Sequence, residues 1–317
     1  MVYIERIINQ CNLFKKILNN EMKIVAHIPF FGPNLEKFKI LRKTIKSLKT
    51  LSKNVEIFVH THNNFLNNKK ISSKIIIHKL SAEDLNKGYL TWKCRKLFEK
   101  QKNKFDIFIY CEHDIFFTKK NFKYWLQHKN ELVKNNFNLG FLTTEFNYTD
   151  NKFYSIHLQK KLINYIKIKN KKYMINPQPY CCMWIYDKIE FKSFIKTKWW
   201  KFKWNGKNYL SFYGTTEMSG IGWNGINMDR YKSTAIPIHN NNKLNIGCFI
   251  RHLTNNYINL KGKIFNHQKT WCKYDIQKVV DNVNRHLPFK EISFLEKLLL
   301  ILKHNSRKVI RIINKII

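Results

Sequence analysis

Apolar and polar residues alternate with two different spacings along the chain. Short apolar runs predict strands at 23–28, 54–60, 74–80, 105–111, 139–145, 180–186, 235–239 and 246–252. Apolar residues that recur every three or four positions predict helices at 35–51, 88–100, 121–134 and 187–198. Strands that alternate with helices are typical of an α/β fold with a mainly parallel sheet.

The stretch 105–118 reads FDIFIYCEHDIFFT and joins an apolar strand to a pair of carboxylates. Both alternating sets of residues up to Cys111 are largely apolar, which indicates a central strand covered on both faces. Glu112 and Asp114 then flank His113, so they emerge at the carboxyl edge of the sheet, where open α/β folds bind ligands. Two carboxylates so placed can share a divalent cation whose open positions are filled by phosphate oxygens. They can equally be ordinary solvated side chains at a strand end.

Residues 112–114, Glu-His-Asp, resemble the DxD motif of nucleotide-sugar glycosyltransferases of the GT-A fold, with glutamate at the first position. In that family the last carboxylate ligates Mn²⁺ or Mg²⁺, and the first contacts the metal or the donor ribose. The resemblance therefore implies that Glu112 and Asp114 hold a divalent metal. It also implies a GT-A-like, Rossmann-like fold over about residues 22–257, with a mixed, mainly parallel sheet flanked by helices.

Two later stretches match further parts of that family pattern. GT-A enzymes often carry an acidic residue at a helix start near the acceptor hydroxyl, where it is the general base in inverting members. Glu217 fits this role, because Thr215 or Thr216 can cap a helix with Glu217 in its first turn. Asp229 is the reserve candidate, and an ordinary capping carboxylate is the alternative for Glu217. His252 corresponds in chain order to the late histidine that many members use as a further metal ligand, and imidazole suits Mn²⁺.

Residues at the ends of the first strands are the expected donor-binding positions. In GT-A enzymes the nucleotide lies over the carboxyl ends of these strands, and a basic side chain from the helix before the central strand approaches the diphosphate or the sugar. The alternatives are core histidines at strand ends and a surface arginine. The resulting candidates are His27, Pro29, Phe30, His60, Thr61, His62 and Arg95.

The formal net charge of +37 permits a nucleic-acid partner, an anionic membrane surface, or drift in a composition rich in lysine. Lysine greatly outnumbers arginine, whereas phosphate-clamping sites favour the arginine fork. We therefore expect compositional drift together with attraction to an anionic membrane surface, rather than a specific nucleic-acid partner. Two alternatives remain open. One is a nucleic-acid-binding protein without catalysis, using the aromatic and basic stretch 199–213. The other is a metal-dependent nucleotidyl or phosphoryl transferase, which would need more acidic residues than the chain offers.

Three segments are expected from the pattern. We expect an amphipathic lead-in helix at residues 1–21, the transferase domain at 22–270, and a basic helical tail at 271–317. The tail resembles helices that lie on anionic lipid, although it could instead dock on the protein or on a second copy. The N-terminus does not read as a signal peptide, and no apolar run is long enough to span a membrane.

Seven scattered cysteines without a CxxC pair argue against a disulfide framework or a zinc ribbon and fit reduced thiols in a cytoplasmic protein. Together these features predict a metal-dependent transferase on the inner face of the membrane. Its donor would be a nucleotide-diphosphate sugar. Its acceptor would be a hydroxyl of a glycan or lipid-linked saccharide of the cell-surface polysaccharide or lipopolysaccharide type.

Overall fold

The structure of the protein is a computed structural model. It describes residues 21–149, 151–155, 163–176, 180–197, 199–200, 214–223, 234–239, 244–259, 270–271 and 279–281. The predicted lead-in helix and basic tail lie outside the described residues for nearly all of their length. Among the described residues, no helix is long and apolar enough to cross a membrane.

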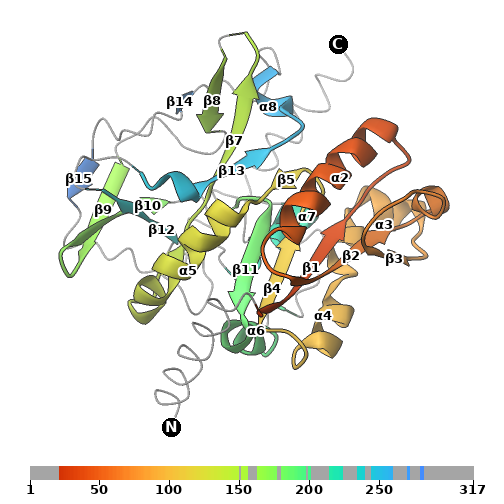
Figure 1. Cartoon of the computed structure of the whole chain (residues 1–317), viewed down its shortest axis with the longest axis horizontal. Helices are drawn as coiled ribbons and strands as arrows, with labels where there is room; N and C mark the ends of the chain where they lie inside the picture. Colours follow the sequence, from red (N-terminus) through yellow and green to blue (C-terminus); the bar gives the residue numbers. More distant parts are fainter. Residues whose placement is uncertain are drawn as a thin grey trace, which may run out of the picture.

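The central sheet has five strands in the order β11-β4-β1-β2-β3 (Figure 1). Strands β1 to β4 run parallel, and β11 pairs antiparallel with β4. This sheet confirms the expectation of a mixed α/β fold with parallel segments. Its strands are β1 (Lys23–Pro29), β2 (Asn54–Thr61), β3 (Lys74–Ile77), β4 (Ile107–Cys111) and β11 (Met183–Asp187).

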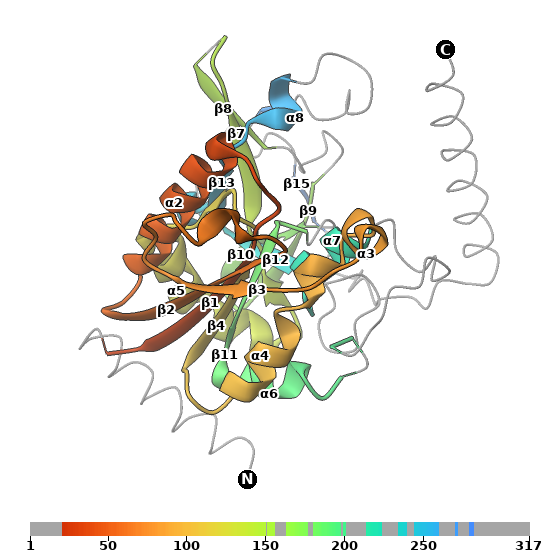
Figure 2. The same cartoon turned by 90° about the vertical axis from the view of Figure 1, so that its right-hand side faces the viewer.

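Alternation along β1 and β4 builds a separate apolar core on each face of this sheet. Ile107 and Ile109 of β4 belong to the core that includes α2 and α5, whereas Phe108 and Tyr110 belong to the core that includes α4, α6 and α7. Figure 2 shows α2 and α5 on one side of the sheet and α4 and α7 on the other. The helices are α2 (Leu35–Lys49), α3 (Ala82–Asn86), α4 (Arg95–Gln101), α5 (Lys119–Lys134), α6 (Lys188–Phe194), α7 (Thr215–Ile221) and α8 (Asn256–Asn259).

Two smaller sheets carry the later strands, and short 3₁₀ turns join several elements. One sheet has the order β14-β8-β7-β13-β5 and the other β15-β9-β10-β12-β6. The first comprises β5 (Ile115–Phe116), β7 (Leu142–Asn147), β8 (Lys152–Ser155), β13 (Phe249–His252) and β14 (Thr270–Trp271). The second comprises β6 (Asn138–Leu139), β9 (Ile163–Ile168), β10 (Lys171–Asn176), β12 (Thr234–Ile238) and β15 (Val279–Asp281). The turns are η1 (Asn64–Leu66), η2 (Tyr89–Trp92) and η3 (Ile246–Cys248).

Tertiary contacts divide two of the predicted elements. The strand expected at 139–145 becomes β6 and β7, because the chain changes sheets at Gly140, whose backbone N–H donates to Ala235 of β12. A side chain at this glycine would meet Ile236. The helix expected at 88–100 becomes η2 and α4, and η2 is held against α7 because the Trp92 indole donates to the Thr215 carbonyl.

Two predicted strands begin later than expected. The strand predicted at 180–186 begins at Met183, because Cys182 has a φ of 61°. This left-handed conformation is strained for a residue with a side chain. Cys181 and Cys182 therefore lie ahead of the strand rather than alternating within it, and both are buried. The run at 246–252 starts as η3, because the Asn245 side chain accepts from the Gly247 N–H and closes a turn.

Three histidines form a hydrogen-bonded series across neighbouring parallel strands. His27 Nδ1 lies 2.7 Å from His60 Nε2, and His60 Nδ1 lies 2.8 Å from His78 Nε2. At the inner end, His27 Nε2 donates to Gln101 Oε1 at 2.8 Å, so each later ring donates to the one before it. Burial lowers the pKa of His27 to about 3 and that of His60 well below its usual value, while burial and then Lys93 lower the pKa of His78. All three rings are therefore neutral at pH 7.

We expect this histidine series to make the protein less stable in mild acid. The depressed folded-state pKa values mean that the stabilisation is complete above about pH 6.5 and is lost as the pH falls toward the folded-state pKa values. Each buried histidine can cost up to about 1.4 kcal/mol per pH unit in that range. Urea unfolding between pH 7.5 and 5 should show this slope in the wild type and a shallower one in His60→Gln. Equal slopes in the two proteins would show that the series does not control acid stability.

Candidate functional site

The carboxyl end of β4 places Glu112 and Asp114 at the edge of the central sheet, as the sequence predicted. The Glu112 N–H donates to the Cys182 carbonyl at 3.0 Å, so pairing with the chain ahead of β11 continues past the end of β4. The Tyr180 hydroxyl donates to Glu112 Oε1 at 2.9 Å. Asp114 is buried, with 8% of its surface exposed. Both carboxylates are thus fixed by neighbouring backbone and side chains.

Strand pairing brings His252 to Asp114 from 138 positions along the chain. β13 pairs antiparallel with β5, so His252 lies opposite Ile115, the residue after Asp114. His252 Nε2 is 3.1 Å from Asp114 Oδ2, and the Leu253 N–H donates to the Asp114 carbonyl at 2.8 Å. The structure therefore brings Asp114 and His252 together.

A third carboxylate, Glu145 of β7, lies on the other side of the imidazole. Its Oε1 is 2.5 Å from His252 Nδ1, and its Oε2 accepts from the Ile258 N–H at 2.7 Å. Glu145 is fully buried. Each ring nitrogen of His252 therefore faces a carboxylate, and Glu145 fixes the orientation of the ring toward Asp114. We call these three residues the carboxylate–histidine chain.

Burial and neighbouring charges shift the pKa values of these groups in opposite directions. Burial opposes the charged form of His252, but hydrogen bonds and charges from Asp114 and Glu145 outweigh it and raise the pKa to about 10. For Asp114, the His252 interaction outweighs burial and lowers the pKa. Burial, followed by repulsion from Asp114, raises the pKa of Glu112 to about 8. Removal of one partner would therefore leave a buried charge uncompensated.

Helix α7 packs directly beside Glu112 and carries Glu217 in its first turn. A side chain at Gly220 would come within 3.2 Å of Glu112 Oε1, so glycine allows the helix to approach this carboxylate. The Trp184 indole donates to the Ser219 carbonyl at 3.1 Å, which fixes α7 on β11. The charge of Glu217 adds a small contribution to the raised pKa of Glu112, so the two carboxylates lie near each other.

The predicted cap of α7 was wrong. Gly214 is the N-cap and makes no side-chain capping bond, while Thr215 and Thr216 lie inside the helix. Glu217 nevertheless occupies the first turn, where the sequence placed it.

The site contains buried polar atoms that have no partner among the described residues. These atoms include Asp114 Oδ1 and His113 Nε2. Native proteins rarely leave such groups unsatisfied, and one explanation for them is a bound ion or ligand. No group of three or more His, Cys, Asp or Glu side chains in the described part of the chain forms a ready metal cage. Asp114 and His252 are adjacent, whereas Glu112 is turned to Tyr180.

Several of the predicted donor-binding residues are buried within the protein. His27 and His60 have no exposed surface and are engaged in the histidine series. Pro29 and Phe30 are also buried, and the Phe30 ring lies edge-on to His113 at 5.6 Å. In this arrangement these four side chains lie in the protein interior rather than on an open surface.

Thr61 ends β2 and His62 follows it, at the carboxyl edge of the sheet. Thr61 Oγ1 and His62 Nδ1 are buried atoms without a hydrogen-bond partner among the described residues. Unlike His27 and His60, they therefore keep hydrogen-bonding capacity that a ligand could use. Their contact with a donor nucleotide stays a prediction.

Arg95 is buried, and its guanidinium is held by two backbone carbonyls and by aromatic rings. Its Nη1 donates to the carbonyls of Trp199 and Trp200, at 2.8 and 2.5 Å, and its guanidinium carbon lies 3.9 Å from the centre of the Trp92 ring. The structure therefore places Arg95 as an anchor for the segment that follows α6. The contact with a diphosphate that the sequence predicted for Arg95 stays a prediction.

The remaining candidates differ in how far the structure describes them. Asp229 and nearly all of the aromatic stretch 199–213 lie outside the described residues. The sequence analysis did not identify Glu145, Tyr180 or Tyr257. The ring of Tyr257 lies 5.5 Å from the ring of His252. A signal for Glu145 existed, since it ends an apolar run in a chain with only 21 acidic residues.

Comparisons with known proteins place few constraints on this site. No model of a known protein family matches the chain, and no curated protein sequence matches it. Among solved structures, the chain is similar to the crystal structure of a glycosyltransferase involved in the glycosylation of the major capsid of PBCV-1. That similarity has a TM-score of 0.28 and 11% sequence identity, over 60% of this chain and 71% of the other.

We expect Glu145 and His252 to be strongly coupled in folding. A double-mutant cycle with Glu145→Ala, His252→Ala and the double variant should give a coupling free energy of about 1–3 kcal/mol, because both groups are buried and the bond is charge-assisted. The measurement is urea unfolding at pH 7.

The matched control for this cycle is the exposed pair of Glu36 and Lys39, whose atoms are 2.7 Å apart. Solvent screening should limit its coupling to about 0.5 kcal/mol. A Glu145–His252 coupling no larger than that of the control would contradict the arrangement described.

Proposed function

We propose that the protein is a metal-dependent glycosyltransferase. It would move a sugar from a nucleotide-diphosphate donor to a hydroxyl of a glycan or lipid-linked saccharide, as in the synthesis of cell-surface polysaccharide or lipopolysaccharide. The observation that carries the proposal is the position of Asp114. It lies just beyond β4, an inner strand of a mainly parallel sheet, beside His252, and one of its oxygens has no partner among the described residues. This edge is where open α/β folds bind nucleotides and phosphates.

The ligand atoms of Asp114 and His252, a carboxylate oxygen and an imidazole nitrogen, suit a divalent cation such as Mn²⁺ or Mg²⁺. A carboxylate and an imidazole together suit Mn²⁺, and the unpartnered oxygen of Asp114 provides a free ligand atom. Glu112 would join them or hold the donor ribose. When bound, such an ion neutralises charge on the diphosphate leaving group.

Glu145 would tune this site without contacting substrate. Its bond to His252 Nδ1 leaves Nε2 as the nitrogen directed toward Asp114. Carboxylates that orient a metal-binding histidine in this way raise its basicity and fix its tautomer. Glu145 is therefore a positioning residue in the proposed mechanism.

Glu217 would act on the acceptor. Its carboxylate lies on α7, beside Glu112, and could accept the proton of an acceptor hydroxyl as that oxygen attacks the sugar. This role applies if the reaction inverts configuration. If configuration is retained, Glu217 would position the acceptor. Asp229 stays the reserve candidate for the base.

We expect one nucleotide to bind in the presence of Mn²⁺ and to lose that dependence in Asp114→Asn. Calorimetry with UDP, GDP, CDP and CMP should show affinity falling at least about 100-fold in this variant, and about 10–100-fold in Glu145→Gln, which acts through His252.

The matched control for this measurement is Asp106→Asn. Asp106 precedes the same strand at its opposite end, where its carboxylate accepts from the Lys23 N–H at 3.0 Å. This variant should bind the nucleotide as the wild type does. Metal-independent binding, or equal losses in Asp106→Asn and Asp114→Asn, would overturn the proposed metal site.

Glu217→Gln should separate binding from chemistry. We expect it to keep nucleotide affinity and to lower kcat by about 10²–10⁴-fold if Glu217 is the base. The measurement is turnover of the nucleotide sugar that matches the bound nucleotide, with nucleotide release as the readout. A kcat within a few-fold of the wild type would exclude Glu217 as the base.

A further inference from the structure

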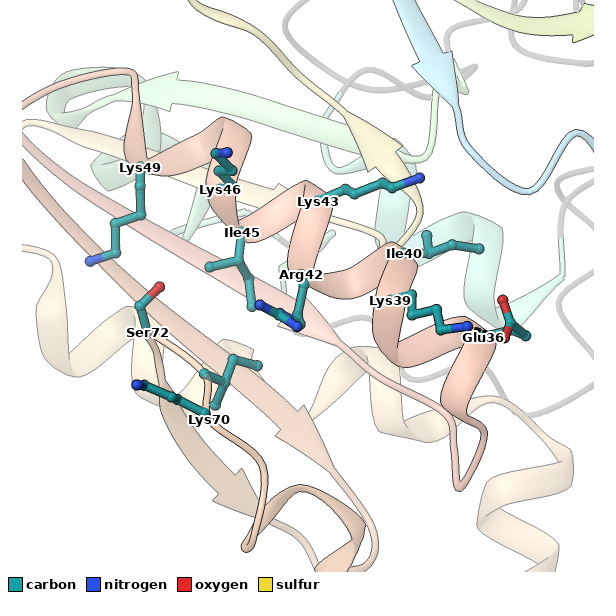
Figure 3. A pocket seen from close by; sticks show the side chains of 11 residues that line it. Glu36, Lys39, Ile40, Arg42, Lys43, Ile45, Lys46, Lys49, Lys70 and Ser72 are labelled. Carbon is teal, nitrogen blue, oxygen red and sulfur yellow. Dashed lines mark hydrogen bonds and ion pairs between the residues drawn. The ribbon is translucent and has the colours of Figure 1, made fainter.

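A basic groove lies between α2 and the segment that leads into β3. Its volume is about 730 Å³, within the range of sites that hold small molecules or lipid headgroups. Figure 3 shows α2 on one side and Lys70 and Ser72 on the other, with the side chain of Arg42 directed from the helix toward them. The groove is separate from the carboxylate–histidine chain, none of whose residues lines it.

Positive charge in this groove greatly exceeds negative charge. Its lining contains one carboxylate, Glu36, which is paired with Lys39 at 2.7 Å. Within the described part of the chain, Arg42, Lys43, Lys46 and Lys70 form no ion pair. The six cations of the lining are Lys39, Arg42, Lys43, Lys46, Lys49 and Lys70.

The spacing of these cations follows from the helix. Lys39, Arg42, Lys46 and Lys49 recur every three or four positions, so they form one stripe on the solvent side of α2. Leu35 begins the same stripe and is 59% exposed. The opposite face of α2 is buried, so the helix cannot rotate to separate these cations from the groove.

The groove is also partly apolar. Ile40, Ile45 and Ile71 contribute to its lining beside the cations. A ligand that fits both features carries phosphate next to hydrocarbon, as a phospholipid does at the membrane interface. The lining contains no aromatic ring on which a base could stack, and it has five lysines with a single arginine. These features favour lipid over nucleic acid.

We propose that this groove binds the phosphate headgroups of an anionic phospholipid membrane. Each lysine or arginine side chain near such a surface adds its own contribution to the binding free energy. The exposed Leu35 at the end of the stripe would enter the interface alongside them.

The position of α2 links this surface to the candidate site. On its buried side, Thr44 Oγ1 donates to the His113 carbonyl at 2.8 Å, and Ser47 Oγ donates to the Phe117 carbonyl at 2.6 Å. A membrane bound to the outer face would therefore lie about one helix diameter, roughly 10 Å, from the segment that carries Glu112 and Asp114. The binding itself does not depend on the proposed transferase chemistry.

Vesicle flotation of the full-length protein tests the proposal without any turnover. The probes are vesicles of phosphatidylcholine alone and vesicles that also contain phosphatidylglycerol. The groove variant is Arg42→Glu, Lys46→Glu and Lys70→Glu. The control is Lys96→Glu, Lys100→Glu and Lys104→Glu, exposed positions around α4 that carry the same change in charge.

We expect the wild type to bind only the anionic vesicles, and the groove variant to bind them roughly 100-fold more weakly than the control variant. A milder set, Arg42→Gln, Lys46→Gln and Lys70→Gln, keeps the test valid if the charge reversals impair folding, which circular dichroism would reveal. On a logarithmic scale, the loss of vesicle affinity in this glutamine variant should be about half the loss in the charge-reversal variant.

Three outcomes would overturn the proposal. The groove and control variants could lose vesicle binding equally, which would assign the effect to overall charge. Soluble glycerol 3-phosphate could bind the groove while vesicles do not, which would indicate a small phosphorylated ligand. RNA binding could depend on the groove while vesicle binding does not, which would indicate a nucleic-acid surface.

Discussion

Strand β4 is packed on both faces, and this constraint decides where the chain can place charge. Ile107 and Ile109 point into one core and Phe108 and Tyr110 into the other, all with 1% exposure or less. No charged side chain can lie within such a strand without a partner. The first positions that can hold carboxylates are those just after it, Glu112 and Asp114. The location of the candidate site thus follows from how the sheet is buried.

The buried carboxylate–histidine chain shows how the protein accommodates charge beyond that point. Asp114, His252 and Glu145 are each 8% exposed or less, yet each has an oppositely charged or hydrogen-bonding neighbour. Isolated buried charges are costly, whereas a paired set holds its members in a fixed geometry. A rigid imidazole between two carboxylates is suited to binding a ligand that enters at Asp114.

The chain uses histidine in two contrasting ways. His252 lies between carboxylates, so its charged form is favoured and its pKa rises. His27 and His60 lie in an apolar core with only neutral partners, so burial dominates and their pKa values fall. All three residues end or lie within strands in apolar sequence contexts. Their surroundings, and not their local sequence, separate a structural histidine from one suited to a site.

Strands β8, β9 and β10 were not predicted from the sequence. Most of the earlier strands and helices, the buried strand at 105–111, and the carboxylates after it could be predicted. These features depend on local periodicity, which strands and helices impose on neighbouring residues. Tertiary structure alone decided that Arg95 donates to the carbonyls of Trp199 and Trp200, that Gly140 moves the chain between sheets, and that His252 meets Asp114. It also revealed Glu145, whose role depends on the pairing of β7 with β13. Contacts between residues over 100 positions apart are set by strand register and packing, which no local pattern of residues encodes.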